Sequence, residues 1–350
     1  MNHRIKIKNH LIGAGHPAYV VAEMSANHNQ KFEEAAKIVE IAKHVGADAI
    51  KLQTYTPDTL TIDCDNKYFQ IGQGTIWEGR KLYELYSEAY TPWEWQPKLK
   101  ELADKIGIDL FSTPFDASAV DFLEKMNVPA YKIASFEIND IALLRWVAKT
   151  GKPIIVSTGM ASLAEIDEAV STVRATGNKQ LALLKCTSAY PSRPEDMNLL
   201  TIPHLAEAFG LPTGLSDHTL GITVPVAAVA LGACVIEKHL TLSRSIPGPD
   251  SAFSLEPHEF KEMVEAVRTT EKAIGKVYYG ASENEMKSRK FRRSLFVVQD
   301  MQSGEAFSTQ NVRSIRPGNG LHTRFLDVII GKKAKTSIKR GTPLSWDIIE

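Results

Sequence analysis

The sequence has few cysteines and no net charge. Only three cysteines, Cys64, Cys186 and Cys234, occur among the 350 residues, and they are odd in number and far apart. They predict neither a disulfide framework nor a zinc-ribbon site, and they are typical of a reducing cytoplasm. The 41 basic and 41 acidic side chains cancel, which excludes a global attraction to nucleic acid or to an anionic membrane.

Long apolar runs are also lacking. The N-terminus has no continuous apolar core of the kind found in signal peptides. The longest apolar stretch, residues 224–236, is shorter than the ~20 residues of a membrane-spanning helix, and Pro225 interrupts it. The hydrophobic fraction of 43% and the charged fraction of 23% are those of a globular protein. We therefore expect a globular, cytoplasmic protein that binds neither nucleic acid nor membrane.

One pattern recurs along most of the chain: a helical stretch ends at a glycine, and a short apolar run then ends in polar residues. In the first case, apolar residues at helical spacing precede Gly46 and the strand-like run AIKLQT. The predicted helices are residues 31–45, 98–106, 116–126, 140–150, 162–176, 199–209, 222–231 and 257–274. The predicted strands lie within residues 19–25, 49–54, 108–114, 130–137, 153–159, 181–190, 212–218 and 234–239.

Strands that alternate with helices imply a parallel sheet, because parallel strands need crossover connections. Eight such units over roughly 250 residues predict an α/β fold, a closed (β/α)8 barrel. An open doubly wound sheet is the alternative, but no glycine-rich dinucleotide fingerprint follows a strand. We predict a barrel at residues 1–280, a linker at 281–293 and a small, mostly β domain at 294–350. Its short strands are expected at residues 294–298, 312–316 and 334–338.

A long insertion, residues 55–95, follows the second predicted strand. It should lie over the mouth of the barrel, and long loops inside compact domains are usually functional or mobile. We expect most of its aromatic rings to anchor the loop and some to face a substrate. These residues are Trp77, Tyr83, Tyr86, Tyr90, Trp93 and Trp95.

Lysines and hydroxyls stand where several predicted strands end, and active sites of such barrels gather at that end. Lys51 and Lys132 would converge there and indicate a phosphate or carboxylate ligand, because lysine supplies charge and hydroxyls supply donors. Lysines that merely extend into solvent are the alternative. The hydroxyl side chains at these strand ends are Thr113, Ser135, Ser157, Ser188, Tyr190 and Ser216.

Two histidines, His218 and His239, end the seventh and eighth strands, which are neighbours in a barrel. With Glu23 or Glu237 nearby they could form an open metal site. Their spacing matches no short metal motif, so ordinary hydrogen-bonded histidines are the alternative. Glu137, just beyond the second lysine, is a candidate acid or base whose pKa burial would raise. A surface carboxylate paired with a lysine is equally compatible with its position.

Taken together, these segments resemble the sialic acid synthase family, whose barrel is followed by an antifreeze-like (SAF) domain. The matching motifs run in family order from residue 21 to residue 320. They are VAEMSANHN, KLQT, FSTPFD, YKIASFE, VSTGM, KCTSAYP, GLSDHT, EKH, PGPD and RPGNG. Residues 76–95, CTSAYP and DSAFSLEP are most similar to the pseudaminic acid synthases. Ser188 and Gln30 stand where the sialic acid branch usually has asparagine and glycine.

The resemblance implies that phosphoenolpyruvate and water condense with open-chain 2,4-diacetamido-2,4,6-trideoxy-L-altrose to give pseudaminic acid and phosphate. N-acetylneuraminate synthase, acting on N-acetylmannosamine, is the alternative. A pyruvate-dependent metal aldolase and a non-enzymatic glycan- or ice-binding protein are two further alternatives.

The resemblance also implies a domain-swapped homodimer, in which an arginine of the small domain reaches the partner's barrel, and a bound Mn or Mg ion. The implied residues are Glu23, Glu137 and Glu237 for catalysis; Lys51, Thr113, Lys132, Ser135, Ser157, Ser188 and Ser216 for phosphoenolpyruvate; Tyr190, Asp250 and Arg316 for the sugar; and His218 and His239 for the metal.

Overall fold

The computed structural model describes residues 3–72 and 76–350, and the chain forms two compact units, Met1–Gly275 and Lys276–Glu350. The segment predicted as a linker, residues 281–293, contains regular structure. It holds the helix α11 (Glu283–Ser288) and the 3-10 turn η6 (Arg289–Phe291). The Gly318 N–H donates to the Lys290 carbonyl, so this segment is part of the second unit.

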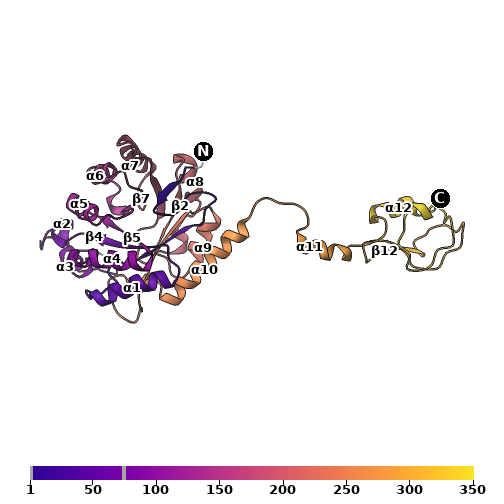
Figure 1. Ribbon diagram of the computed structural model, residues 1–350, viewed down its shortest axis with the longest axis horizontal. Coiled ribbons are helices and arrows are strands. Elements are labelled where there is room, and N and C mark those ends of the chain that lie inside the picture. The colour runs from indigo at the N-terminus through magenta and orange to yellow at the C-terminus, as the bar shows by residue number, and fades with distance from the viewer. Residues whose placement is uncertain (1–2, 73–75) are drawn as a thin grey trace. The chain divides into compact units, whose positions relative to one another are not determined.

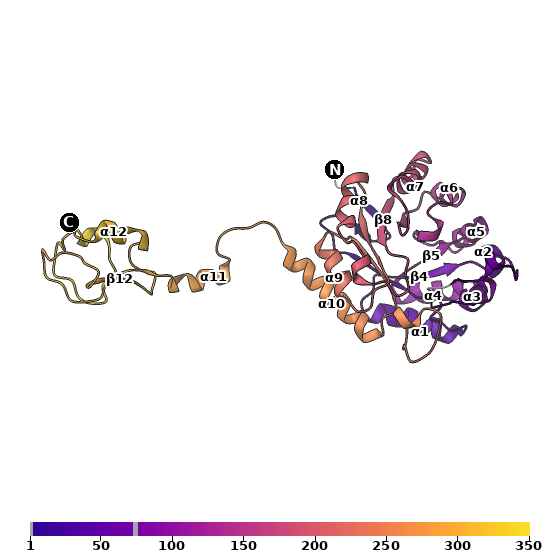
Figure 2. The ribbon, with the colours of Figure 1, turned by 180° about the vertical axis from the view of Figure 1, so that it is seen from behind.

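Eight parallel strands of the described chain close into a barrel, as predicted, and helices surround it (Figures 1 and 2). The strand order follows the sequence, and the last strand pairs with both its predecessor and the first. The strands are β3 (Tyr19–Glu23), β4 (Ala49–Thr54), β5 (Asp109–Pro114), β6 (Tyr131–Ile133), β7 (Ile154–Ser157), β8 (Leu181–Cys186), β9 (Thr213–Asp217) and β10 (Val235–His239).

The predicted helices are also found, each within a few residues of the expected bounds. They are α1 (Phe32–His44), α4 (Gln96–Ile106), α5 (Ala117–Lys125), α6 (Ile141–Lys149), α7 (Leu163–Ala175), α8 (Thr201–Phe209), α9 (Thr223–Ala230) and α10 (Pro257–Ile274). Ser162 and Glu165 form a capping box at the start of α7. Gly107 ends α4 at φ 74°, a left-handed conformation that glycine adopts without steric cost. Among the described residues, no helix is long and apolar enough to cross a bilayer.

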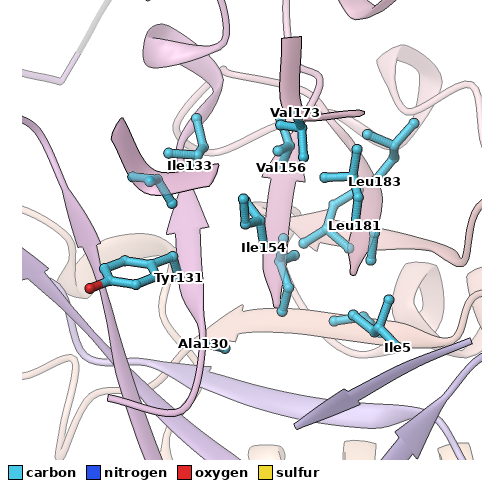
Figure 3. Close-up of a cluster of buried hydrophobic side chains, with 14 of the residues drawn as sticks. Ile5, Ala130, Tyr131, Ile133, Ile154, Val156, Val173, Leu181 and Leu183 are labelled. Carbon is cyan, nitrogen blue, oxygen red and sulfur yellow. The ribbon is translucent and has the colours of Figure 1, made fainter. Parts of the chain in front are cut away.

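An N-terminal hairpin, which the sequence pattern did not predict, packs against the barrel. Its antiparallel strands are β1 (Ile5–Ile7) and β2 (His10–Ile12). Three isoleucines of the hairpin are buried in the core cluster that also contains Ile154 and Leu181, the first residues of β7 and β8 (Figure 3). The hairpin therefore covers the N-terminal ends of the strands and leaves their C-terminal ends for the site.

The insertion after β4 is partly helical. Its elements are α2 (Pro57–Leu60), the 3-10 turn η1 (Lys67–Phe69), α3 (Leu82–Ala89) and the 3-10 turn η2 (Trp93–Trp95). Residues 73–75, which belong to the predicted insertion, lie outside the described residues.

The second unit has its own small core around two antiparallel strands. The elements are β11 (Ser294–Val297), β12 (Val312–Ile315), the one-turn helix α12 (Leu326–Ile329), and the 3-10 turns η7 (Thr323–Phe325) and η8 (Trp346–Ile348). The prediction of a strand at residues 334–338 is wrong. In the described chain Ala334 bridges to Ile349 and Ile338 to Met301. Because the two ends of the segment pair with different partners, no continuous ladder forms.

Candidate active site

A cavity of about 410 Å³ lies at the C-terminal ends of the barrel strands. This volume is typical of a small-molecule site. Most of the predicted site residues line it, although they come from strands that are far apart in the sequence. They are Glu23, Lys51, Lys132, Ser135, Glu137, Ser157, Tyr190, Ser216, His218, Glu237, His239 and Asp250.

Three predicted residues do not line the cavity. Thr113 lies behind Lys51, with its Oγ1 3.4 Å from the lysine Nζ. Ser188 Oγ is buried and has no hydrogen-bond partner among the described residues. A Cβ on Gly159 would clash with this hydroxyl and with that of Ser135, so glycine is needed for the two serines to approach. Arg316 belongs to the second unit, and its role stays a prediction.

A charge network occupies the floor of the cavity. Lys51 is buried and pairs with Glu23 and with Glu237, whose Oε1 is 3.3 Å from its Nζ. The Nζ of Lys132 is 3.5 Å from the same Glu237 oxygen and donates to Ser157 Oγ at 2.7 Å. Glu237 thus lies between both lysines. The formal charges of this network cancel, so an incoming anion must draw the lysines away from their carboxylates.

Burial and pairing shift the pKa values of these four groups in different directions. Burial raises the pKa of Glu23 to about 6, although Lys51 opposes the shift. Burial would also raise the pKa of Glu237, but Lys132 and Lys51 outweigh it and hold that pKa below its ordinary range. Burial lowers the pKa of Lys132. Burial would also lower the pKa of Lys51, but Glu23 and Glu237 outweigh it and raise that pKa. Glu23 is therefore the member of the network that can take up a proton near neutral pH and release Lys51 to a ligand.

Glu137 ends the 3-10 turn η3 (Ser135–Glu137), which follows β6 directly. Its Oε2 is buried and has no hydrogen-bond partner among the described residues. Burial raises the pKa of Glu137 to about 7, and Lys132 only partly opposes this shift. A carboxyl group with such a pKa is half protonated at neutral pH, which suits proton transfer to or from a ligand.

The two predicted histidines lie side by side, with ring centroids 5.3 Å apart. His218 Nδ1 is 3.1 Å from the Thr187 carbonyl; as a donor to it, Nδ1 leaves Nε2 as the free ligand atom. Burial, followed by the charge of His218, lowers the pKa of His239 well below its ordinary value, so this ring stays neutral.

The Nδ1 of His239 is buried without a hydrogen-bond partner in the described chain. Neutral imidazoles are the form that binds a metal. Burial would lower the pKa of His218, but Cys186 and the Thr187 carbonyl outweigh burial and raise it, so the pair fits a divalent ion that binds in competition with a proton on His218. Among the described residues, no group of three or more histidine, cysteine, aspartate or glutamate side chains could hold such an ion. Water and substrate oxygens would therefore complete its coordination.

Cys186, at the end of β8, is a cavity residue that our sequence analysis did not select. Its Sγ is 3.9 Å from His218 Nδ1. Burial would raise the pKa of this thiol, but His218 outweighs burial and brings it to about 7. Its position at a strand end was visible in the sequence, whereas its contact with an imidazole was not.

One side of the cavity is an apolar wall supplied by the insertion. We define the apolar wall by its residues: Leu60, Ile71, Trp77, Leu82, Leu85 and Tyr86. Six aromatic residues of the insertion were candidates either to anchor the loop or to face a substrate, and of these six only Trp77 and Tyr86 line the cavity. Trp77 packs against Tyr190, with ring centroids 5.4 Å apart. Trp93 packs against Phe122 and Trp95 against Phe32, so these rings anchor the insertion.

A family model described as the NeuB family matches residues 38–279, well over half of the chain. The chain belongs to the NeuB family. A SAF domain model matches residues 292–350. The predicted resemblance, the barrel and the SAF domain are therefore confirmed for this NeuB-family chain.

Two relatives are similar to the chain over almost their whole length. A pseudaminic acid synthase from Helicobacter pylori is 47% identical over 335 residues, which cover 95% of this chain and 98% of the relative. A pseudaminic acid synthase from Campylobacter jejuni is 49% identical over 326 residues, which cover 93% and 95%. The crystal structure of an N-acetylneuraminic acid synthetase from Leptospira borgpetersenii is 33% identical, with a TM-score of 0.74, covering 82% of this chain and 95% of that one.

Proposed function

We propose that this protein condenses phosphoenolpyruvate with open-chain 2,4-diacetamido-2,4,6-trideoxy-L-altrose and water, giving pseudaminic acid and phosphate. The observation that carries the reaction is one cavity lined by two buried lysines, a carboxyl group with a pKa near 7 and two adjacent imidazoles. The identities of 47% and 49% to pseudaminic acid synthases support the acceptor sugar.

Phosphoenolpyruvate would lie over the charge network. Lys51 and Lys132 would neutralise its phosphate, and preorganised charges act strongly in a site that is shielded from water. Protonation of Glu23 would free Lys51 for this role. The hydroxyls that would hold the ligand directly are those of Ser135, Ser157 and Ser216, which line the cavity. Of the other two predicted hydroxyls, that of Thr113 would act through Lys51 and that of Ser188 from beside Ser135.

His218, through Nε2, and His239 would hold a Mn or Mg ion. When bound, the ion supplies Lewis-acid polarisation of the sugar's aldehyde oxygen. The two side chains suit this role because burial keeps His239 neutral and the Thr187 carbonyl orients His218. The remaining positions stay open for exchangeable ligands.

In the proposed reaction, carbon 3 of phosphoenolpyruvate attacks the aldehyde carbon, and positive charge develops at carbon 2. Water adds to carbon 2, and the carboxylate of Glu137 accepts the proton that this water loses and passes it to the alkoxide formed from the aldehyde oxygen. The tetrahedral intermediate then expels phosphate, which takes the proton of the carbon 2 hydroxyl as the carbonyl forms, and Lys51 and Lys132 stabilise the phosphate charge throughout. Glu237 keeps both lysines in place between turnovers.

The acceptor sugar would lie against the apolar wall, with Tyr190 and Asp250 as its polar contacts. A trideoxy sugar with two acetamido groups has more apolar surface than N-acetylmannosamine, because it has a methyl group at carbon 6 and a second acetyl methyl. We expect a higher kcat/KM for the trideoxy sugar, measured as phosphate release at saturating phosphoenolpyruvate. Equal values, or a preference for N-acetylmannosamine, would reject the acceptor and leave the general reaction. Pyruvate turnover without phosphate release would instead indicate an aldolase.

Ile71→Thr tests the apolar wall directly, because the side chain stays branched at Cβ while its ethyl group is replaced by a hydroxyl. The ratio of kcat/KM between the two sugars should fall roughly tenfold, since one apolar group in a pocket is worth this much discrimination. Ile62→Thr is the matched control, because Ile62 lies in the same insertion and is 57% exposed. An unchanged ratio in Ile71→Thr would show that this side of the cavity does not contact the sugar.

We further propose a cytoplasmic, domain-swapped homodimer in which the partner's second unit brings Arg316 to the sugar. A guanidinium offers a fixed fork of donors that suits an acetamido oxygen. The unpaired state of Cys64, Cys186 and Cys234 is compatible with a reducing compartment.

A further inference from the structure

We infer that Lys238, a fully buried lysine outside the cavity, positions the two imidazoles of the metal site; this inference rests on the proposed function. Its neighbours Glu237 and His239 line the cavity, whereas Lys238 does not. Side chains alternate along a strand, so Lys238 points to the outer side of the barrel. Its exposed fraction is 0%, which is costly for a lysine unless every donor finds a partner.

The Nζ of Lys238 links the segments that carry both histidines. It pairs with Asp217 Oδ2 at 2.5 Å and donates to the Thr219 carbonyl. Asp217 in turn accepts from the Thr219 N–H at 3.1 Å and from its hydroxyl at 2.9 Å. Asp217 and Thr219, the residues on either side of His218, are therefore linked to Lys238, the residue directly before His239.

The strand register shows why such a tie matters. Lys238 and Asp217 are the last residues of β10 and β9 that pair with each other. His239 continues beside Glu23 of β3, but His218 lies beyond the end of β9. On its other side, the Ser192 N–H donates to the His218 carbonyl. The contacts of Lys238 supply the connection from His218 to β10, and so they set the separation of the two rings.

Lys238→Met removes the tie but leaves the charge of Asp217 buried and unpaired, which lowers stability. The double variant Asp217→Leu/Lys238→Met removes both charges and should regain thermal stability. We expect both variants to bind Mn²⁺ 10- to 100-fold more weakly, the range for residues that orient metal ligands. The substrate-free protein is titrated with Mn²⁺, and the concentration of free Mn²⁺ is measured at each step from its electron paramagnetic resonance signal. Calorimetric affinity for phosphoenolpyruvate should stay within twofold, because Lys51 and Lys132 are untouched.

Asp109→Asn is the matched control. Asp109 is a buried carboxylate at the opposite end of the barrel, where it accepts from the Tyr19 hydroxyl at 2.8 Å. This variant should lose thermal stability and keep its Mn²⁺ affinity.

Mn²⁺ affinity within twofold of the unaltered protein in the folded double variant would overturn the inference, even if the unaltered enzyme releases phosphate as proposed. A parallel loss of phosphoenolpyruvate affinity would also overturn it, because the pair would then only support the fold. If the unaltered protein binds no Mn²⁺, the metal assignment fails and this inference fails with it.

Discussion

Replacing Lys132 by methionine isolates the contribution of one cation to phosphoenolpyruvate binding. Methionine keeps an unbranched side chain of similar length, so the variant removes the charge with little loss of packing. In the unaltered protein, Nζ donates to Ser157 Oγ at 2.7 Å and lies 3.5 Å from Glu237 Oε1. Glu237 would still pair with Lys51 and accept from Ser216 at 3.1 Å, so we expect the variant to fold.

The expected loss follows from what Lys132 would give the phosphate. A hydrogen bond to a charged group contributes about 1.5–3 kcal/mol, which at about 1.4 kcal/mol per factor of ten corresponds to a ~10- to 150-fold loss of affinity. The negative charge of Glu237 places the expected loss of affinity near the upper end of this range. The lysines hold its pKa below the ordinary range, and without Lys132 its remaining negative charge faces the phosphate with one cation fewer. We expect the dissociation constant to rise about 100-fold.

The assay is calorimetric titration of phosphoenolpyruvate into each variant, because KM equals the dissociation constant only when chemistry is slow. Lys185→Met is the matched control, since Lys185 lies on β8, is partly buried and donates to the Cys186 carbonyl at 2.7 Å outside the cavity. Its affinity should stay within twofold. A folded Lys132→Met protein with a dissociation constant within threefold of the unaltered value would refute the assignment of this lysine to the ligand.

Three further predictions concern proton transfer, the metal and the second unit. The proposed reaction needs Glu137 as a carboxylate, which predominates above its pKa of about 7, and Glu23 protonated, which predominates below its pKa of about 6, so kcat/KM should follow a bell-shaped pH profile with its maximum between these values, and Glu137→Gln should abolish the rise on the acid side. Chelation should stop phosphate release, and Mn or Mg should restore it; normal turnover of His218→Ala or His239→Ala in chelator would contradict the metal site. Mixing Arg316→Ala with Lys132→Ala chains should recover part of the activity in heterodimers, and no recovery despite proven subunit exchange would place the arginine's action within its own chain.

The barrel could be predicted from the sequence because its signals are local and repeated. Each unit shows a helical period, a terminating glycine and a short buried strand, as in the helix that ends at Gly107 and the strand that begins at Asp109. Once the strands are parallel, their C-terminal ends must share one edge. Lys51, Lys132 and His239 were therefore assigned to one site from their positions at strand ends alone, and the cavity confirms that they lie together.

The features that the sequence did not predict depend on contacts between distant segments. The hairpin strands β1 and β2 have three residues each, which is too short for a period to emerge. The placement of Glu237 between two lysines requires the register of several strands. The contact between Cys186 and His218 requires the register of β8 and β9, which pairs Cys186 with Ser216, two residues before His218. Ile71 faces the cavity only because of the path of the insertion.

The period of two along β10 explains how one strand end serves both halves of the proposed reaction. Glu237 and His239 face the cavity, and their Cα atoms are about 6.6 Å apart at a rise of about 3.3 Å per residue. The first contacts the lysines assigned to phosphoenolpyruvate, and the second lies beside His218. β9 repeats this arrangement, because Ser216 donates to Glu237 and His218 follows two residues later. Two neighbouring strands thus supply an anion subsite and a metal subsite one pleat apart, which is the proximity that bond formation between phosphoenolpyruvate and an aldehyde requires. A one-residue shift of either strand would bring its buried ion-pair member, Asp217 or Lys238, into the cavity and turn its histidine away.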